Sequence, residues 1–384
     1  MRRRAAVAGG GIAGMAAAGA LARHGFEVCV HERAPGLREL GAGIYLKENS
    51  LRVLDQLDVY ERLEARAVRL AETRLRTEGG RLVLTRRVAR ERTLVALRED
   101  LHALLTEAAE AAGAEIRTRS RVETAAPSGA LTLQGGREAD RPDLVVGADG
   151  LHSRVRTTAG IDGRVRILAD GATRLLIPRT ETQPVSTEHW SGRLRVGVTP
   201  CSPDQTYVFL IGPESDEHAR RLPVDTEYWL RSFPYLGEVF ERVVGAEGTH
   251  HPHALVECSR WTRGRIALVG DAAHAQPPNL GQGAGLAIAN AWALARTLQP
   301  SDTVEAGLAA WEAQNFPLSR RVQRWSHRYG LAGHRWPPRL HGARTATLWV
   351  IGHSPYTRDQ WAWLWRGGVS DGDQPARSTW TETA

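Results

Sequence analysis

Short apolar runs divide the chain into segments that predict a parallel sheet with helices between its strands. Largely apolar runs at residues 5–8, 26–31, 143–147 and 266–269 have the length of buried strands. Helical periodicity covers residues 15–24, 49–63 and 98–112, and a long helix extends from the glycines at 281–285 to about residue 298. Strands that alternate with helices in this way are typical of an α/β fold.

A second pattern, the alternation of apolar and polar residues, predicts antiparallel strands in two separate stretches. Residues 68–92 alternate on both sides of a Gly79-Gly80 turn, which predicts a hairpin. Residues 164–259 contain further alternating runs between Pro and Gly turns. Helices are expected again after residue 300. Their tryptophans are expected to pack in the core rather than form a cofactor site: Trp311, Trp325, Trp336, Trp361, Trp363 and Trp365.

Composition narrows the class of protein. The chain has 384 residues, enough for two domains, and its apolar content of 42% excludes a disordered chain. The net charge is +7, but the arginines are spread along the chain, so we expect no nucleic-acid partner. Lys47 is the only lysine. Cys29, Cys201 and Cys258 lack metal-ligand spacing, so we expect reduced, buried thiols and no metal site.

The first residues imitate a secretory signal, because Met1-Arg2-Arg3-Arg4 precedes an Ala-rich stretch. The same stretch contains a nucleotide-binding pattern that cleavage would remove, so we expect a cytoplasmic protein. No apolar run approaches the length of about 18 residues that a membrane span needs. We therefore expect no membrane partner.

The nucleotide-binding pattern is a GxGxxG turn between the first strand and the first helix. Its cofactor-facing positions are Gly9, Gly11, Ile12, Ala13 and Gly14. Such glycines let the backbone approach a pyrophosphate at the start of a helix. Glu32 follows the second strand, about twenty residues later, where an acid suits a ribose hydroxyl. Arg33 is either an adenine contact or a surface arginine.

Two further positions extend this candidate site. Gly43 and Ile44 belong to a flexible stretch in which small residues flank an apolar one, so the backbone can approach a flat ring; a simple loop is the alternative. Arg98 begins a predicted helix, which is the wrong end for a cation in the field of the helix dipole. That position suggests that Arg98 binds a phosphate or a ribose.

Two later strands each end in glycine and an acid. Asp149 and Gly150 follow the strand at 143–147, and Gly270 and Asp271 follow the strand at 266–269. A carboxylate just past a strand can accept a hydrogen bond from a ribose or ribitol hydroxyl. A stiff Pro277-Pro278 turn and a Gly-rich loop that opens a helix come next, and such a loop binds anions. The residues expected to contact a cofactor here are Pro278, Gly281, Gly283, Ala284 and Gly285.

These three motifs, in this order, resemble the single-component flavin aromatic hydroxylases, the family of para-hydroxybenzoate hydroxylase. The resemblance covers nearly the whole chain. It implies a discontinuous Rossmann-like FAD-binding domain (1–67, 95–163 and 260–300), an inserted antiparallel β-sheet substrate domain (68–94 and 164–259) and a C-terminal helical region (301–384). It also implies FAD as the cofactor and NADH or NADPH as a transient co-substrate that has no domain of its own.

Within that family, the segments at 41–46 and 174–179 resemble those of 2-methyl-3-hydroxypyridine-5-carboxylate oxygenase. The resemblance implies substrate contacts at Tyr45, Arg179, Arg195 and Tyr207, and it places Pro278 beside the flavin with its carbonyl toward the site of hydroxyl transfer. The chain departs from that pattern at Ala71, where a tyrosine is expected, and at 276–279, which is closer to the wider family. These departures leave the identity of the oxidised ring open.

The implied reaction uses NAD(P)H, O2 and a C4a-hydroperoxide of the flavin to hydroxylate an electron-rich ring. A 3-hydroxypyridine carboxylate-like N-heteroaromatic, with or without ring opening, is the first expectation, and a phenolic acid or larger aromatic metabolite is the alternative. A flavin-dependent reductase, a halogenase, for which Lys47 stands in the wrong place, and a non-catalytic flavoprotein are remoter. A homodimer is a candidate assembly. His274 is expected to be a satisfied buried histidine more than a ligand contact.

Overall fold

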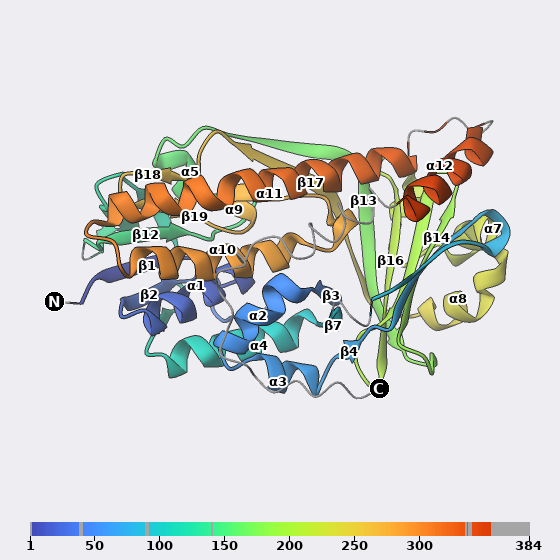
Figure 1. Cartoon of the computed structure of the whole chain (residues 1–384), viewed down its shortest axis with the longest axis horizontal. Helices are drawn as coiled ribbons and strands as arrows, with labels where there is room; N and C mark the ends of the chain where they lie inside the picture. Colours follow the sequence, from blue (N-terminus) through green and yellow to red (C-terminus); the bar gives the residue numbers. More distant parts are fainter. Residues whose placement is uncertain are drawn as a thin grey trace.

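Two large sheets lie at opposite ends of the molecule, and the long helices α10 and α11 run beside the first toward the second (Figure 1). This computed structural model describes residues 2–37, 41–88, 92–139, 141–334, 336 and 340–354. Trp361, Trp363 and Trp365 lie outside the described residues. Within the described part, no helix is both long and apolar enough to cross a membrane.

The first sheet is the parallel one. Its strands, in spatial order, are β18 (Thr262–Arg263), β19 (Ile266–Leu268), β12 (Leu144–Gly147), β1 (Arg4–Ala8), β2 (Glu27–His31) and β8 (Glu115–Arg117). All neighbouring strands are parallel except β18 and β19. A parallel sheet covered on both faces needs apolar residues on both, which explains the continuous apolar runs in the sequence. Strands from three distant parts of the chain thus meet in one sheet.

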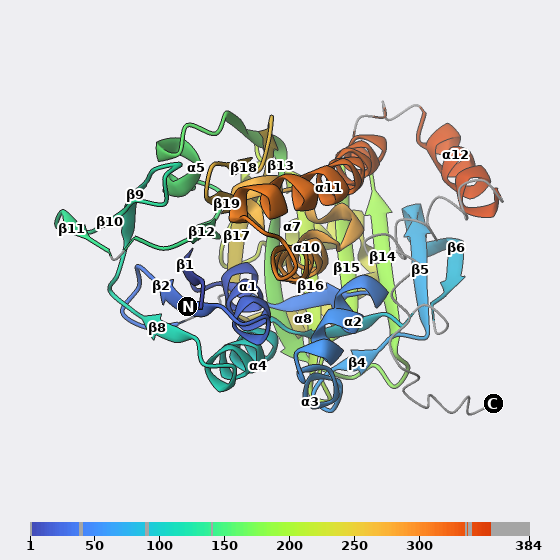
Figure 2. The ribbon, with the colours of Figure 1, turned by 60° about the vertical axis from the view of Figure 1, so that its left-hand side comes forward.

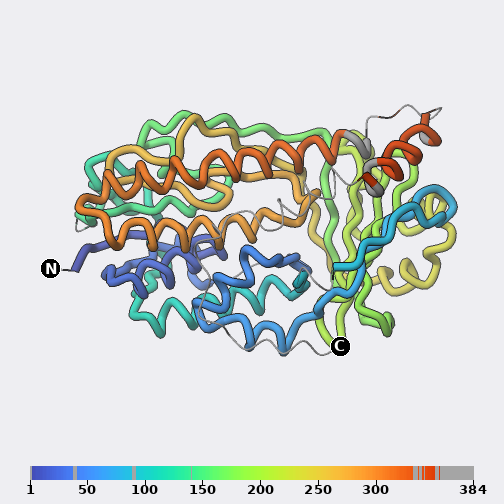
Figure 3. Tube along the Cα trace, viewed as in Figure 1, coloured from blue at the N-terminus to red at the C-terminus, as the bar shows by residue number. Residues whose placement is uncertain are grey.

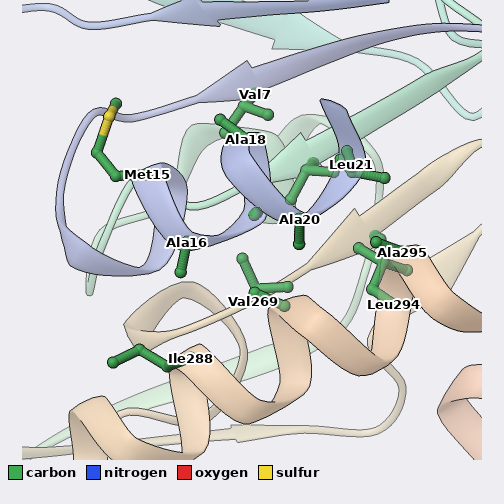
Figure 4. Packing of buried hydrophobic residues seen from close by; sticks show 14 of the residues in the cluster. Val7, Met15, Ala16, Ala18, Ala20, Leu21, Val269, Ile288, Leu294 and Ala295 are labelled. Atoms are coloured by element: carbon green, nitrogen blue, oxygen red, sulfur yellow. The ribbon is translucent and has the colours of Figure 1, made fainter. Parts of the chain in front are cut away.

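Small side chains hold the helices close to this sheet. Helix α1 (Ile12–Arg23) packs along α10 (Gly283–Leu298), and α4 (Arg98–Ala111) packs against α1 on another side. Figure 4 shows Ala16 and Ala20 of α1 pointing toward the α10 side, with Val269 between the helices. Alanine keeps a helix surface narrow, so two helices can approach closely without leaving voids.

The second sheet has seven strands. In spatial order they are β17 (Gly248–Cys258), β13 (Gly163–Pro178), β16 (Gln205–Pro213), β15 (Leu194–Pro200), β14 (Val185–Ser191), β5 (Glu72–Thr77) and β6 (Arg81–Arg87). Every pair is antiparallel except β14 and β5. Figure 2 shows these strands side by side, with β5 and β6 at one edge. The α/β fold with an antiparallel substrate sheet, as the sequence predicts, is confirmed.

Alternation along the strands gives this sheet two different faces. One face packs Leu175, Val208 and Leu210 against Trp229 and Phe233 of the segment that forms α7 (Thr226–Ser232) and the turn after it. Helices α6 (Glu217–Arg220) and α8 (Gly237–Val243) also lie on this side. Because side chains of a strand alternate in direction, the residues between these apolar positions point to the opposite face, toward the parallel sheet.

A three-stranded sheet joins the two large ones. It consists of β3 (Gly43–Leu46), β7 (Leu94–Leu97) and β4 (Val68–Arg69), all antiparallel. A separate hairpin sheet contains β9 (Val122–Ala125), β10 (Leu131–Leu133) and β11 (Arg137–Glu138). Val68 and Arg69 therefore pair with β7 and not with the seven-stranded sheet, and the predicted domain boundaries stay a prediction.

The single helix predicted over residues 49–63 is wrong, because the structure has two. Helix α2 (Glu48–Gln56) ends before Asp58, whose φ of 57° is left-handed, and α3 (Tyr60–Glu64) follows. The amide of Val59 donates to the carbonyl of Leu54, which closes the end of α2. Aspartate tolerates the left-handed region better than most residues, and this signal was present in the sequence.

The C-terminal helices cross from one sheet to the other. Helix α11 (Val304–His334) contains Pro317 and runs along the molecule toward the seven-stranded sheet, and α12 (His341–His353) follows (Figure 3). Trp311 is fully buried and contacts Trp261 at 5.6 Å between ring centroids, and Trp325 is partly buried against a small cluster beside α10. Both tryptophans pack in the interior.

Candidate active site

One cavity of about 950 Å³ extends from the glycines after β1 to the inner face of the seven-stranded sheet. Its walls come from the loops that follow β1, β2, β12 and β19, from β3 and from strands β13, β14, β16 and β17. The carboxyl ends of parallel strands meet at one edge of a sheet, which is where ligands bind in open α/β folds. The chain thus places its glycine motifs and a polar β-sheet surface around a single space.

The GxGxxG turn is built so that only glycine fits at two positions. Gly9 has a φ of 102°, and a Cβ there would lie 2.5 Å from the carbonyl oxygen of Ala148. A Cβ on Gly14 would lie 1.9 Å from the carbonyl oxygen of Gly9. Gly11, Ile12 and Ala13 line the cavity at the start of α1. The first amides of a helix lack partners within it, so they can receive a pyrophosphate here.

Glu32 and Arg33 form the end of the cavity beside this turn. The Glu32 carboxylate accepts hydrogen bonds from the Gly10 amide at 2.7 Å and from the Ala34 amide at 2.8 Å. The two amides fix the carboxylate at the carboxyl end of β2, the position from which an acid reaches a ribose. Both residues therefore lie where the sequence motif places them.

Asp149 lies at the end of β12. One of its oxygens, Oδ2, accepts the amides of Arg154 at 2.7 Å and Val155 at 3.1 Å, at the start of α5 (Arg154–Thr158). The other, Oδ1, is buried and has no hydrogen-bond partner among the described residues. Gly150 follows with a φ of 84°, and both residues line the cavity. Buried polar atoms are nearly always paired, so Oδ1 is an acceptor that a ligand hydroxyl can satisfy.

The loop after β19 brings the third motif to the same cavity. Gly270 has a φ of 60°, and a Cβ there would lie 2.6 Å from the Cβ of Ala13, so this loop packs directly on α1. Asp271 begins α9 (Asp271–His274) and lines the cavity. Gly283 and Ala284, at the start of α10, line it too.

Two predictions for this loop need qualification. Gly285 lies off the cavity wall, with Gln282, Ser50 and Asn49 as nearest neighbours of a Cβ placed there, because it faces α2. The carbonyl of Pro278, in the turn η4 (Pro278–Leu280), accepts the Gly281 amide at 2.9 Å, so it already has a donor, although Pro278 itself lines the cavity.

His274 is buried and absent from the cavity wall. Its Nε2 lies 3.0 Å from Nδ2 of Asn290, and burial lowers its pKa to about 4. It is a satisfied core histidine.

Strand β3 and helix α4 complete the cofactor half. Gly43 and Ile44 line the cavity, and a Cβ on Gly43 would lie 2.7 Å from the ring of Tyr207. The absence of a side chain at Gly43 therefore lets β3 lie against the seven-stranded sheet. Arg98, the first residue of α4, also lines the cavity, and its amide donates to the Ala42 carbonyl at 3.0 Å.

The two predicted tyrosines lie in the substrate half. Tyr45 donates or accepts hydrogen bonds with the hydroxyls of Ser186 at 2.9 Å and Thr199 at 2.6 Å, and burial raises its pKa. Burial also raises the pKa of Tyr207, while the guanidinium of Arg174 beside it favours the ionised form. Both tyrosines line the cavity as neutral phenols.

The two predicted arginines do not line the cavity. Arg179 lies beyond the end of β13, and its guanidinium donates to the carbonyls of Glu181 at 2.9 Å and Ser202 at 3.0 Å. Arg195 has only 1% of its surface exposed and donates to Glu188 at 3.5 Å. It thus lies behind a cavity-lining carboxylate.

Sequence reasoning missed four polar residues on the inner face of the seven-stranded sheet: Arg174, Glu188, His251 and His253. Burial and then the positive charge of Arg174 lower the pKa of His251, and burial lowers the pKa of His253 to about 3, so both rings are neutral. Arg174 belongs to the segment 174–179, on which the family resemblance was partly based. The sequence does not indicate whether Arg174 or Arg179 of that segment faces the cavity.

The residues present fit FAD. Gly9 and Gly270 line the cavity at turns too tightly packed for any side chain, and Gly14 lies off the cavity wall, where it packs against the Gly9 carbonyl. The unpartnered oxygen of Asp149 can accept a hydroxyl. Within the described part of the chain, no group of three or more His, Cys, Asp or Glu residues is arranged to hold a metal ion.

Comparisons with known proteins agree with this fit. A family model described as FAD binding domain matches residues 2–326. A probable 2-heptyl-3-hydroxy-4(1H)-quinolone synthase of Rhodococcus erythropolis is 36% identical over 341 residues, which covers 86% of this chain and 88% of that protein. A 3-amino-4-hydroxybenzoate 2-monooxygenase of Streptomyces platensis is 33% identical over 351 residues, 86% of this chain and 88% of that protein.

A solved structure, the tetrameric form of 2-methyl-3-hydroxypyridine-5-carboxylic acid oxygenase, has a TM-score of 0.82 and 33% sequence identity, and the match covers 93% of this chain and 94% of that one. Family, relatives and fold agree with a cavity built around a dinucleotide and an aromatic ring. The chain belongs to the FAD binding domain family and is an FAD-dependent aromatic monooxygenase, with NAD(P)H as its co-substrate.

Proposed function

We propose that this enzyme hydroxylates an N-heteroaromatic ring that carries an oxygen substituent. The observation that carries the proposal is the inner face of the seven-stranded sheet, where Arg174, Tyr207 and Phe209 line the same cavity as the FAD-binding glycines. In the reaction, one atom of O2 enters the ring, the other leaves as water, and NAD(P)H is oxidised. Two of the proteins compared above are named for quinolone or pyridine compounds, which supports this ring class.

The residues of the chain act on the ring by position and charge. When bound, FAD supplies the activation of O2. The guanidinium of Arg174 and the hydroxyl of Tyr207 stabilise negative charge on an oxygen substituent, which makes the ring electron-rich. The two sheets enclose the cavity between them and exclude water from the reacting atoms.

Hydroxylation of a phenolic acid is the second candidate. A carboxylate matches the planar fork of Arg174, and a relative 33% identical is named for an aminohydroxybenzoate. Opening of a pyridine ring is a variant of the first candidate, and it differs in that the product gains two oxygen atoms.

The test is oxygen-dependent oxidation of NADH and NADPH by the purified holoenzyme, with mass spectrometry of the products. The panel contains 2-methyl-4(1H)-quinolone, a 3-hydroxypyridine carboxylate and 3-amino-4-hydroxybenzoate. Stimulation by a heterocycle that gains one oxygen supports the proposal, and a gain of two supports ring opening. Stimulation by the benzoate alone supports the second candidate. Hydrogen peroxide as the sole product with every compound contradicts both.

We also propose a homodimer and a cytoplasmic location. Cys29, Cys201 and Cys258 are free thiols, and burial raises the pKa of Cys201 to about 12 and that of Cys258 to about 11. Such inert thiols suit a reducing compartment but do not require one. Light scattering of the purified protein tests the assembly, and a tetramer, as in the pyridine oxygenase named above, would replace the dimer.

A further inference from the structure

A single row of cross-strand neighbours on the inner face of the seven-stranded sheet has opposite charges at its two ends. Arg174 of β13 pairs with Phe209 of β16, Phe209 pairs with Gly197 of β15, and Gly197 pairs with Glu188 of β14. Neighbouring strands are about 4.8 Å apart, so the backbones of Arg174 and Glu188 are separated by about 14 Å. Both charged side chains line the cavity.

The middle of this row is an apolar floor. A Cβ on Gly197 would lie 2.0 Å from the ring of Phe209, so the ring lies across the glycine and covers the strand. The Phe209 ring lines the cavity, and it can lie flat on the strand only because Gly197 has no side chain. A planar ring can therefore stack over Phe209 with one edge toward Arg174 and the other toward Glu188.

The Glu188 end of the row is held by a buried cation. Arg195 lies behind Glu188 and stacks on Trp190, with 4.5 Å between its guanidinium carbon and the ring centroid. Its Nη1 donates to Glu188 Oε1 at 3.5 Å and to Asn279 Oδ1 at 3.3 Å, and its Nη2 donates to the Gly330 carbonyl at 3.2 Å. Burial of an arginine is costly in free energy unless the charge is compensated, and Glu188 compensates it.

The Glu188 carboxylate nevertheless keeps access to the cavity, with 23% of its side chain exposed. The bond from Arg195 also links it to Asn279, the residue after Pro278, so the carboxylate lies beside the loop that borders the flavin site. An ionised carboxylate is an acceptor only, so it favours a ligand that offers an N–H or O–H at this edge.

The Arg174 end has the opposite preference. Its guanidinium lies beside the Tyr207 hydroxyl, and its positive charge acts on His251 and His253, which are neutral and lie on β17. A guanidinium is a donor only, so this end favours a carbonyl, phenolate or carboxylate oxygen.

We propose that Glu188 accepts the ring N–H of the substrate while Arg174 binds the oxygen substituent on the opposite side of the ring, so that the enzyme selects 4-oxo-1H heterocycles. The inference rests on the proposed function and specifies its substrate class. A 4-quinolone or 4-pyridone has an N–H and a carbonyl at opposite positions of one ring, which matches a row with an acceptor at one end and a donor at the other. A carboxylate placed near Glu188 is repelled.

The test compares 2-methyl-4(1H)-quinolone with its N-methyl analogue, which keeps the carbonyl but has no N–H. Binding to the holoenzyme is measured by the change in flavin absorbance, and turnover by ligand-stimulated NAD(P)H oxidation. A hydrogen bond to a charged group contributes about 1.5–3 kcal/mol, so the wild type should bind the N–H compound about 10- to 100-fold more tightly. Glu188→Gln should reduce this preference to a few-fold.

Glu241→Gln is the matched control, because Glu241 is exposed on α8, on the far side of the sheet, and it should keep the wild-type preference. FAD content and thermal unfolding show whether each variant is folded. If Glu188→Gln loses FAD, Glu188→Asp takes its place, because it keeps the charge beside Arg195 and withdraws it from the ligand by one methylene. It should weaken the preference too.

Two results would overturn the inference and are distinguishable from failure of the proposed function. If the wild type is stimulated equally by both quinolones, or if the Glu188 variants keep the full preference, heterocycle hydroxylation stands and the role of Glu188 falls. If no heterocycle binds or stimulates NAD(P)H oxidation, the proposed function and the inference fail together.

Discussion

The substitution Arg195→Met tests whether Arg195 contacts the substrate, as the family resemblance implies, or positions Glu188 from behind. The guanidinium has 1% exposed surface and lies behind Glu188, stacked on Trp190 and contacting Asn279 and Gly330. These contacts make Arg195 a positioning residue that fixes a cavity wall. Methionine is unbranched like the arginine stem but ends before the guanidinium carbon, so the variant removes the charge, the donors and the stacking on Trp190 while it keeps the apolar stem.

The expected cost follows from those contacts. The substitution removes three long hydrogen bonds, two of them to side chains, and the cation–π contacts with Trp190 and Tyr329. Because these contacts are long, each contributes about 1 kcal/mol, less than a short hydrogen bond to a charged group. The desolvation cost of the guanidinium is recovered, which offsets part of the loss. Glu188 is partly exposed, so its unpaired charge is stabilised by solvent. We therefore expect a loss of about 2–3 kcal/mol, which lowers the melting temperature of this 384-residue chain by about 3 °C.

The assay is thermal unfolding of the holoenzyme with excess FAD, together with ligand binding followed by flavin absorbance. Arg164→Met, at an exposed position of β13, is the control and should leave both unchanged. Arg195→Met should lower the melting temperature and weaken binding of 2-methyl-4(1H)-quinolone less than 10-fold. An unchanged melting temperature with a loss of binding above 100-fold would refute the positioning role and restore Arg195 as a direct contact. In a double-mutant cycle, Arg195→Met and Glu188→Gln should be non-additive for stability.

Three shorter predictions concern the cofactor site and the core. Gly14→Val should abolish FAD binding, because even a Cβ lies 1.9 Å from the Gly9 carbonyl oxygen; FAD retained at wild-type content after gel filtration would contradict the motif geometry. Lys47→Met should weaken FAD binding about 10-fold in a titration of the apoenzyme. The reason is that the buried ammonium donates to the Leu280 carbonyl at 2.7 Å and so fixes the turn beside the flavin site. An unchanged affinity would show that the turn is stable without this hydrogen bond. Burial lowers the pKa of His274 from 6.5 to about 4. Between these two pH values the histidine is protonated in the unfolded chain but neutral in the native state, so the free energy of unfolding should decrease as the pH falls from about 6.5 to about 4. Urea midpoints of His274→Gln should fall less over that window, and a decline equal to that of the wild type would exclude His274 as a contributor.

Features that depend on local backbone conformation could be predicted from the sequence. The turn at Gly9 and Gly14 tolerates no side chain, and Asp149 and Gly270 each follow a short apolar strand, so residue type and spacing define these positions. The wrong prediction of one helix over 49–63 was also local, since a left-handed Asp58 ends α2. Local rules were available there, but helical periodicity on both sides of Asp58 outweighed them.

The substrate half depends on contacts between distant segments, so sequence alone could not assign it. Arg174 lies within β13 and lines the cavity, whereas Arg179 lies one residue beyond the end of that strand, where its guanidinium donates to the carbonyls of Glu181 and Ser202. Only the fold separates the two arginines in this way. Strand alternation directs Arg195 to the same face of the sheet as Glu188 and Phe209. Helix α11 nevertheless separates it from the cavity, because Arg195 donates to the carbonyl of Gly330, which is distant in the sequence.

The sequence by itself therefore determined the glycine turn of the dinucleotide motif, because a glycine at a strained turn is required by the backbone within a few residues. The tertiary structure decided which polar side chains line the cavity. Strand register and the packing of α11 determine whether an arginine lines the cavity or lies behind it, and both arise from contacts between residues tens to more than a hundred positions apart.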